Sequence, residues 1–406
     1  MTVHKLYIYF LASTLLFLTG CIEEIDFIEE SFESALVIDA TITNEDKKHE
    51  IFLSRTYPFE EDGPDPARNA SVKVIGDGVE YVFEEADAGV YISEIAFAAQ
   101  PNVDYQLQFT TQNGRSYISS PTQLTQNTQI DNLYAERETN DDGVNGMSMY
   151  VDSFDPTGKS MYYRYEYEET FKVVPPHFIN MDLIEVLNPA DLITCCPVEL
   201  VFRSEDKRIC YRTENSRSIN LTTTTALSED RVSRHLVRFV HSDDYKISYR
   251  YSILVRQYVQ SKEAYSYLEK LSGFSGAGSL FSQVQPGFLT GNIVSESNPE
   301  EKVIGFFEVS SVSTKRIFFN YDDFYPGEPI PPYINSCQLS APRQCITDAH
   351  DDICGGLLVG IRNKTKVYKS MNNGIIDPGG PYIMVDRVCG DCTALGEPNP
   401  PDFWVE

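Results

Sequence analysis

Short runs of alternating apolar and polar residues recur along the chain from Phe32 onward. Up to Thr122 they cover residues 36–42, 51–53, 70–75, 81–83, 89–92, 105–109 and 116–118, separated by Gly, Asp, Asn and Pro. Successive side chains of a strand point to opposite faces, so this two-residue period predicts strands with one buried face. Short strands at this spacing predict an N-terminal immunoglobulin-like β-sandwich over residues 32–122.

The alternation resumes after a polar connection at residues 123–129. Residues 161–168 place Tyr163, Tyr165 and Tyr167 on one face and mostly charged side chains on the other, and residues 246–256 repeat the pattern. This period predicts strands of a sheet with one polar face. We therefore expect a larger β-rich domain over residues 123–406, for which the pattern allows either a sandwich or a barrel.

One segment has a helical period instead. Ser261 can cap it, Glu263 lies in its first turn, and Gly273 follows the apolar positions 264, 265, 268 and 271. These features predict one short helix. The longest later apolar runs, such as Leu357–Ile361, have the length of a strand, so we expect no second membrane segment. The expected fold class is all-β.

The first 20 residues differ from the rest of the chain. A positive start precedes an apolar run from Leu6 to Leu18, which is too short to remain in a bilayer and predicts a signal peptide over residues 1–20. The sequence Leu18-Thr19-Gly20-Cys21 resembles the bacterial lipobox, whose cysteine receives acyl chains such as palmitate. We expect a lipid anchor in the outer membrane at Cys21; an ordinary signal peptide with a chance cysteine is the alternative.

An acidic cluster of Glu23, Glu24 and Asp26 follows this cysteine within an expected tether, residues 21–31. The cluster resembles the export tag that directs Bacteroidota lipoproteins to the outer surface of the outer membrane. A solvated acidic linker is the alternative, since runs of like charge are usually solvated. The resemblance implies a lipid-anchored protein that faces the extracellular side.

The charge balance narrows the class of partner. Lys and Arg total 33 against 60 Asp and Glu, which gives a formal net charge of -27. Nucleic-acid binding requires a basic surface, so we expect no nucleic acid as partner. Hydrophobic residues make up 42% of the chain, which is typical of a folded protein, so the acidic residues belong to its surface.

The chain has nine cysteines, and eight remain if Cys21 is lipidated. In an exported protein an even number indicates disulfides, although eight cysteines allow 105 pairings. The candidates form two groups of odd size, so if all of them pair, at least one bridge joins the groups. The candidates are Cys195, Cys196, Cys210, Cys337, Cys345, Cys354, Cys389 and Cys392.

Several motifs resemble sites of known chemistry. Gly158-Lys159-Ser160 resembles the end of a P-loop, but Ser153 stands where its first glycine belongs, so a turn is the better interpretation. Cys389-Gly390-Asp391-Cys392 has thioredoxin spacing, but the prolines after it disfavour the helix that a redox pair requires, which indicates a structural bridge.

Metal binding has two candidate segments. Zinc could bind the C-terminal cysteines with His350, although an oxidising compartment favours bridges. A hard cation could bind residues 350–352 or 321–323, although neither follows the EF-hand pattern and solvated turns are the simpler interpretation. We expect no metal site, no cofactor and no catalytic residues.

A series of motifs in order resembles one family. They include residues 162–170, 255–258, 278–281, 291–293 and 305–307, the closing Cys389–Cys392 pair and Pro401-Asp402-Phe403-Trp404. Together they resemble the Bacteroidota lipoproteins of domain-of-unknown-function family 4249. Two departures, Tyr211 in place of a frequent Trp and the additional pair Cys195-Cys196, leave the disulfide pattern open. The resemblance implies proximity to TonB-dependent outer-membrane receptors, beside whose genes such families are commonly encoded, and no established activity.

The expected function is that of a non-enzymatic, surface-exposed accessory subunit that aids ligand capture by a TonB-dependent transporter. The alternative is a structural or adhesive surface lipoprotein without a transporter. An enzyme built on unfamiliar loops is a third hypothesis, which a pocket with converging carboxylates or histidines would favour.

Overall fold

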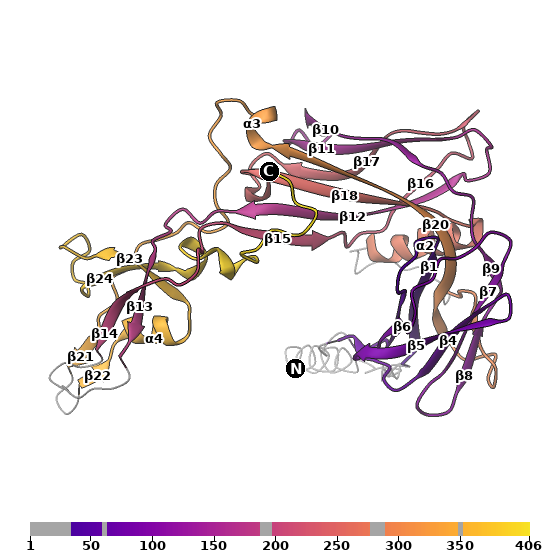
Figure 1. The fold of residues 1–406 in the computed structure, drawn as a ribbon, viewed down its shortest axis with the longest axis horizontal. Helices are drawn as coiled ribbons and strands as arrows, with labels where there is room; N and C mark the ends of the chain where they lie inside the picture. Colours follow the sequence, from indigo (N-terminus) through magenta and orange to yellow (C-terminus); the bar gives the residue numbers. More distant parts are fainter. Residues whose placement is uncertain (1–33, 59–62, 187–196, 277–288, 348–351) are drawn as a thin grey trace, which may run out of the picture.

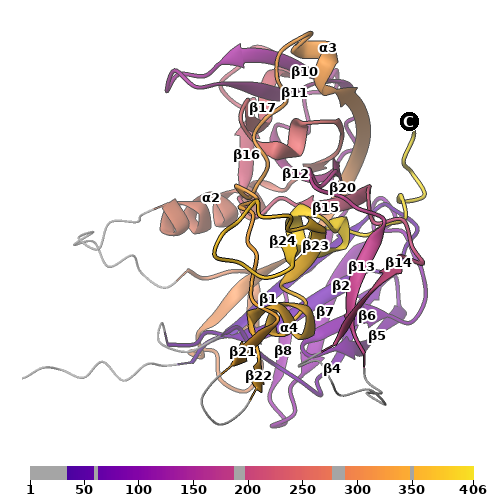
Figure 2. The ribbon, with the colours of Figure 1, turned by 90° about the vertical axis from the view of Figure 1, so that its left-hand side faces the viewer.

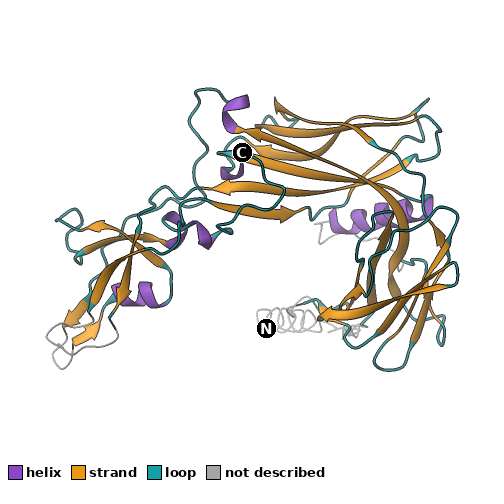
Figure 3. Cartoon of the chain, in the orientation of Figure 1, coloured by secondary structure: helices purple, strands orange, loops and turns teal. Residues whose placement is uncertain are grey.

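The computed structural model describes residues 34–58, 63–186, 197–276, 289–347 and 352–406. Three lobes form an arch, in which an N-terminal lobe and a small lobe hang from opposite ends of a middle sandwich (Figure 1). Strands dominate all three lobes (Figure 3), so the predicted all-β class is confirmed. The small lobe is a unit that the sequence pattern did not separate from the larger domain. None of the helices in the described part of the chain is long and apolar enough to cross a membrane.

The N-terminal lobe is a curled sheet with strand order β20-β1-β2-β6-β5-β4-β7-β8-β19. Its inner face encloses a core that includes Ile38, Tyr91 and Phe109. The alternation within β1 explains its position, because residues 36, 38, 40 and 42 are buried while residues 37, 39 and 41 lie on the outer face. The strands are β1 (Leu36–Thr43), β2 (Glu50–Arg55), β3 (Asp65–Pro66), β4 (Ser71–Gly76), β5 (Val79–Asp87), β6 (Val90–Ser93), β7 (Asp104–Thr110), β8 (Ser116–Ser119) and β9 (Thr122–Gln123).

Two later strands complete this lobe. β19 (Ile293–Ser295) pairs with β8, and β20 (Val303–Asn320) runs parallel to β1 from Val303 to Ser310. Ile293 and Phe307 are therefore part of the N-terminal core. The domain division at residue 122 stays a prediction, but the core of the first unit draws residues from far beyond it.

The middle lobe is a sandwich of two sheets. One sheet has the order β15-β12-β18-β20, with β16 also paired to β12, and the other has the order β10-β11-β17. Tyr163 and Tyr165 are buried in the core between the sheets and Tyr167 packs against it, as the alternation predicts. The strands are β10 (Ile130–Thr139), β11 (Asn145–Asp155), β12 (Tyr162–Val173), β15 (Cys210–Asn215), β16 (Asn220–Thr223), β17 (Asp230–His241) and β18 (Arg250–Val259).

The strand expected at residues 246–256 begins later than its pattern suggests. Tyr245–Ile247 form a 3-10 helix, because the Asp244 carboxylate accepts a hydrogen bond from the Lys246 N–H at 3.0 Å and caps the turn. The local cap outweighs the period of two, and β18 starts at Arg250.

β20 connects the two larger lobes. Its residues pair with β1 up to Ser310 and with β18 from Ser311 to Asn320. One continuous strand therefore holds the N-terminal lobe against the middle sandwich, as Figure 1 shows.

The small lobe consists of three short hairpins and one helix, and Figure 2 looks directly onto it. Its core contains Leu183, Leu357, Tyr368 and Met384. The elements are β13 (Met181–Glu185), β14 (Val198–Phe202), β21 (Cys345–Thr347), β22 (Asp352–Cys354), α4 (Gly356–Arg362), β23 (Lys366–Met371) and β24 (Tyr382–Asp386), followed by 3-10 turns at Arg387–Cys389 and Cys392–Ala394.

The expectation of a single helix is wrong in number. The predicted helix is α2 (Lys262–Gly276), in which the Ser261 hydroxyl accepts a hydrogen bond from the Ala264 N–H at 3.0 Å, but it continues past Gly273. The structure adds α3 (Tyr321–Phe324) and α4. The apolar run at residues 357–361 lies in α4, because periodicity cannot distinguish a short buried strand from a buried helical turn.

Two disulfides link segments that are distant in sequence. Cys210 is bonded to Cys392 and Cys337 to Cys389, with sequence separations of 182 and 52. The first bridge joins the two cysteine groups and ties the middle of the chain to its end. Cys389 and Cys392 therefore do not pair with each other, despite their thioredoxin spacing.

Candidate binding pocket between the two larger lobes

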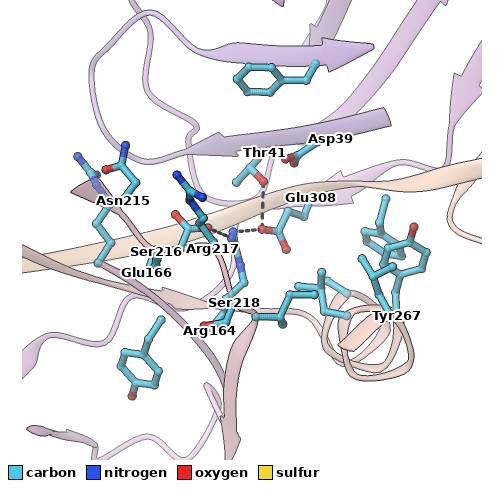
Figure 4. Close-up of a pocket in the computed structure, with 18 of the residues that line it drawn as sticks. Asp39, Thr41, Arg164, Glu166, Asn215, Ser216, Arg217, Ser218, Tyr267 and Glu308 are labelled. Carbon is cyan, nitrogen blue, oxygen red and sulfur yellow. Dashed lines mark hydrogen bonds and ion pairs between the residues drawn. The ribbon is translucent and has the colours of Figure 1, made fainter. Parts of the chain in front are cut away.

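A pocket of about 790 Å³ lies where the N-terminal lobe meets the middle sandwich (Figure 4). This volume falls within the range of small-molecule sites. Its lining combines apolar and charged side chains from β1, β2, β12, β18, β20, α2 and the loop between β15 and β16.

The outer face of the N-terminal sheet forms one side of the pocket. β1 and β20 are parallel and in register there, so Val37 pairs with Ile304, Asp39 with Phe306, and Thr41 with Glu308. All six of these residues line the pocket because they occupy alternate positions on one face of the sheet. Each strand thus brings apolar and ionisable groups to the same surface.

A buried ion pair joins the two lobes at this surface. Arg164 of β12 donates a hydrogen bond from Nη2 to Glu308 Oε1 at 2.7 Å, and it also pairs with Glu166. Glu308 accepts further hydrogen bonds from Thr41 Oγ1 at 3.2 Å and from Gln260 Nε2 at 2.9 Å. Both members of the pair are largely shielded from water, so these contacts are needed to offset the cost of desolvation.

The environment of Arg164 keeps it charged. Burial acts to lower the pKa of its guanidinium, but the Glu308 and Glu166 carboxylates outweigh that effect and raise it. The guanidinium also lies 4.2 Å from the centre of the Tyr258 ring, a cation–π contact. Arg164 is therefore a fixed cation whose charge the neighbouring carboxylates already compensate.

Asp39 is in a different situation. Its carboxylate is accessible from the pocket, and Figure 4 shows no hydrogen bond from the drawn residues to it. Desolvation by the surrounding protein raises the pKa of Asp39, the Arg164 charge opposes this, and the Glu308 and Glu166 charges add to the increase. Asp39 therefore provides a negative charge that its surroundings do not fully compensate.

Helix α2 supplies an apolar wall. Tyr267, Leu268 and Leu271 line the pocket on one face of the helix, and the Tyr267 ring lies 5.6 Å from that of Phe306. Burial, together with the Asp39 charge, raises the pKa of Tyr267 to about 12, so its hydroxyl stays protonated at neutral pH. The wall therefore presents aromatic and aliphatic surface beside Asp39.

The opposite rim is the loop between β15 and β16. The Ser216 hydroxyl accepts a hydrogen bond from the Tyr167 N–H at 3.1 Å, which fastens the loop to β12. Arg217 follows on this loop with an exposed side chain, whereas Arg256 of β18 is paired with Glu45 at 2.9 Å. This arrangement can bind an amphipathic ligand, since it joins a charged surface to an apolar one.

The candidate sites from the sequence lie elsewhere. Gly158-Lys159-Ser160 forms the turn between β11 and β12, where Asp155 accepts hydrogen bonds from the N–H groups of residues 157, 159 and 160. Burial alone would raise the pKa of Asp155, but these bonds and those from the Thr157 and Ser160 hydroxyls lower it. The turn is a structural cap, which agrees with the interpretation that it is no P-loop.

Several candidate metal ligands are already engaged, and others lie outside the described residues. Cys337 and Cys389 form a bridge, and Asp323 accepts a hydrogen bond from the Asn320 N–H in the cap of α3. Cys345 and Cys354 stand opposite each other in the register of β21 and β22. In the described ranges, no three His, Cys, Asp or Glu residues are grouped to hold a metal ion. The metal candidate His350 lies outside the described residues, as do the expected lipidation site Cys21, the export-tag residues Glu23, Glu24 and Asp26, and the disulfide candidates Cys195 and Cys196.

Sequence reasoning missed the pocket. Asp39, Arg164 and Glu308 are far apart in the chain and match no catalytic or ligand-binding motif, although Arg164 lies within the family motif at residues 162–170. One weak signal for the pocket was present in the sequence of β1. Asp39 is the only charged residue in this strand of apolar and small residues, and it lies on the exposed face.

The fold and the pocket define a class: an all-β protein with a ligand-sized pocket at the junction of two lobes. Residues 22–316 match the model of a domain of unknown function, DUF4249, so the chain belongs to that family. This confirms the predicted family over residues 22–316, a range that includes β13 and β14 of the small lobe and ends within β20. No curated protein matches the chain.

Proposed function

We propose that this protein is a non-enzymatic, surface-exposed outer-membrane lipoprotein that acts as an accessory subunit of a TonB-dependent transporter and helps to capture its ligand. The observation that carries the binding role is the pocket between the two larger lobes. Its volume of about 790 Å³ and its mixed apolar and charged lining suit a small molecule or a short peptide.

The state of the lining carboxylates supports binding over catalysis. A general acid or base must exchange protons during its reaction. Glu308 and Glu166 are paired with Arg164, and Glu168 is paired with Arg316 at 2.6 Å. Such pairs already engage these carboxylate oxygens with fixed protein partners, which suits recognition and the joining of the two lobes.

The location rests on the N-terminal sequence. The lipobox ending at Cys21 and the acidic residues that follow it support anchoring in the outer membrane. A lipid anchor leaves the three lobes in the aqueous phase beside other proteins of the same membrane. This placement suits a subunit that delivers a ligand to a transporter.

A pull-down from outer membranes tests the proposal. The tagged protein is extracted in mild detergent and its bound proteins are identified by mass spectrometry, with the Cys21→Ser variant, which cannot be lipidated there, as the matched control. We expect one TonB-dependent receptor in nearly equal amount with the lipoprotein, and loss of both membrane retention and receptor with the variant. Recovery of the lipoprotein alone refutes the transporter role and favours the structural or adhesive alternative.

A further inference from the structure

The charges that line the pocket do not balance. Three arginines face five carboxylates, and the carboxylates are Asp39, Glu50, Glu166, Glu168 and Glu308. Arg164 and Arg256 are neutralised by the carboxylates that hold them, and Glu168 is likewise neutralised by Arg316. Arg217 and Glu50 are exposed, so water and salt screen their charges, and the remaining excess comes from Asp39 and from the two carboxylates that share Arg164. The potential inside the pocket is therefore negative.

Asp39 is the carboxylate that contributes most directly to this negative potential. The nearest guanidinium, Arg164, directs its hydrogen bonds to Glu308 and Glu166, as the dashed lines in Figure 4 show. The carboxylate of Asp39 is thus accessible from the pocket and retains its capacity to accept hydrogen bonds from a ligand. A carboxylate in a partly desolvated site forms strong hydrogen bonds to a cationic donor.

Apolar surface surrounds this carboxylate. Phe52 of β2 and Phe306 of β20 stand opposite Asp39 in the register of the sheet, one on each side. Tyr267 is close enough for the Asp39 charge to affect its pKa, and its ring contacts that of Phe306. Aromatic faces attract cations, so the rings and the carboxylate favour the same ligand charge.

We propose that the pocket binds an organic cation: an ammonium or guanidinium group pairs with Asp39, and an attached apolar body packs against Phe306 and α2. This inference rests on the proposed function and names the class of ligand. The volume of about 790 Å³ accommodates more than a single amine, so a short basic peptide with an aromatic residue fits the description.

Three peptides that differ in charge test the inference. They are acetyl-phenylalanyl-arginine amide, its citrulline counterpart, which replaces the guanidinium by a neutral urea of similar shape, and its glutamate counterpart. Binding is measured by calorimetry on the full-length lipoprotein in nanodiscs of zwitterionic lipid. We expect the arginine peptide to bind at least about tenfold more tightly than the citrulline peptide, and the glutamate peptide to bind most weakly.

Two variants locate the two halves of the ligand. Asp39→Asn is expected to reduce the preference for arginine to within about twofold, whereas Asp46→Asn, an exposed carboxylate in the loop after β1, leaves it unchanged. Leu268→Ala, on α2, is expected to weaken both peptides by about threefold or more. Equal binding of the arginine and citrulline peptides, a preference that survives Asp39→Asn, or no binding at all overturns the inference.

The two proposals fail separately. Recovery of a transporter in the pull-down together with no preference for the cationic peptide refutes the ligand class and leaves the accessory role intact. A preference for the cationic peptide without a transporter refutes the accessory role and leaves the ligand class intact.

Discussion

The bridge between Cys210 and Cys392 offers a quantitative test of the fold. Both cysteines are buried in the core of the middle sandwich, at the point where the end of the chain returns to β15. Around the bridge, the Cys392 N–H donates to the Lys207 carbonyl at 3.0 Å, and Tyr211 and Glu397 exchange two backbone hydrogen bonds at 2.8 and 2.9 Å. The bridge thus holds the C-terminal segment against the sheet.

The stabilisation follows from the length of chain that the bridge closes. A cross-link between residues 182 apart removes about 5 kcal/mol of chain entropy from the unfolded state, as the free-energy equivalent at 25 °C. The same relation gives about 4 kcal/mol for Cys337–Cys389, whose separation is 52. The four cysteines are buried to a similar degree, so the loss of packing should differ little between the two bridges.

Paired substitutions test this difference. We expect the Cys210→Ala/Cys392→Ala variant to lose about 1 kcal/mol more of its free energy of unfolding than the Cys337→Ala/Cys389→Ala variant. Guanidinium unfolding is followed by circular dichroism and by fluorescence of Trp404, the single tryptophan. A larger loss in the Cys337–Cys389 variant refutes the reasoning. A loss below about 0.5 kcal/mol in either variant also refutes it, because removing a native disulfide typically costs roughly 2–5 kcal/mol.

Trp404 adds a local observable to the same experiment. Its ring lies 5.0 Å from that of Tyr211 and 5.8 Å from that of Phe318, on the outer face of the sheet β15-β12-β18-β20 of the middle lobe. Without the Cys210–Cys392 bridge, the C-terminal segment keeps only non-covalent contacts with this face. We therefore expect the Trp404 signal to change at lower denaturant than the circular dichroism in that variant, and the two signals to coincide in the other.

Three further predictions concern the junction between the lobes. Arg164→Leu leaves the Glu308 carboxylate buried without its cation, so we expect the free energy of unfolding, measured with guanidinium, to fall by about 3–5 kcal/mol. The Arg164→Leu/Glu308→Leu double variant should recover most of this loss. A loss below about 1 kcal/mol in the single variant contradicts the reasoning. The folded state raises the pKa of Asp39 above its ordinary value of 3.8, so ionised Asp39 destabilises the fold above that raised pKa. Asp39→Asn should consequently be more stable than the native protein at neutral pH, with the difference disappearing as the pH falls below 3.8 in thermal unfolding, and an equal difference at both pH values refutes the assignment. Gly305→Ala places a Cβ 2.4 Å from a carbonyl oxygen of β1 at a positive φ, so we expect a loss of about 1–3 kcal/mol, whereas Gly273→Ala in α2, which meets no atom within 4 Å, should be neutral or stabilising.

Local pattern was sufficient for most strands of the N-terminal lobe and for two long strands of the middle lobe, β12 and β18. The alternation in residues 36–42 and 161–168 identified β1 and β12 together with their buried faces, because the period of two depends on neighbours along the chain alone. The capping Ser261 likewise identified the start of α2. Where a short signal competed with another, as at residues 246–249 and 357–361, the sequence was ambiguous and the cap or the surrounding core decided.

The candidate pocket could not be predicted in this way. It forms because β20 pairs with β1 across more than 260 residues of chain and then continues into the middle sandwich, which places Glu308 beside Arg164. The sequence of neither strand specifies its partner, because many strands in this chain have the same period of two residues. The register of that one pairing aligns Asp39 with Phe306.

The sequence by itself therefore determined the all-β class, the family and the acidic surface, all of which depend on composition or on the order of residues. It also raised the expectation of a lipid anchor at Cys21. The tertiary structure alone decided that Cys389 and Cys392 bond to different partners, that a third lobe separates from the larger domain, and that charged residues of five strands meet in one pocket. The reason is that strand pairing and disulfide choice minimise the free energy of the whole chain, through contacts between segments that no local window of sequence contains.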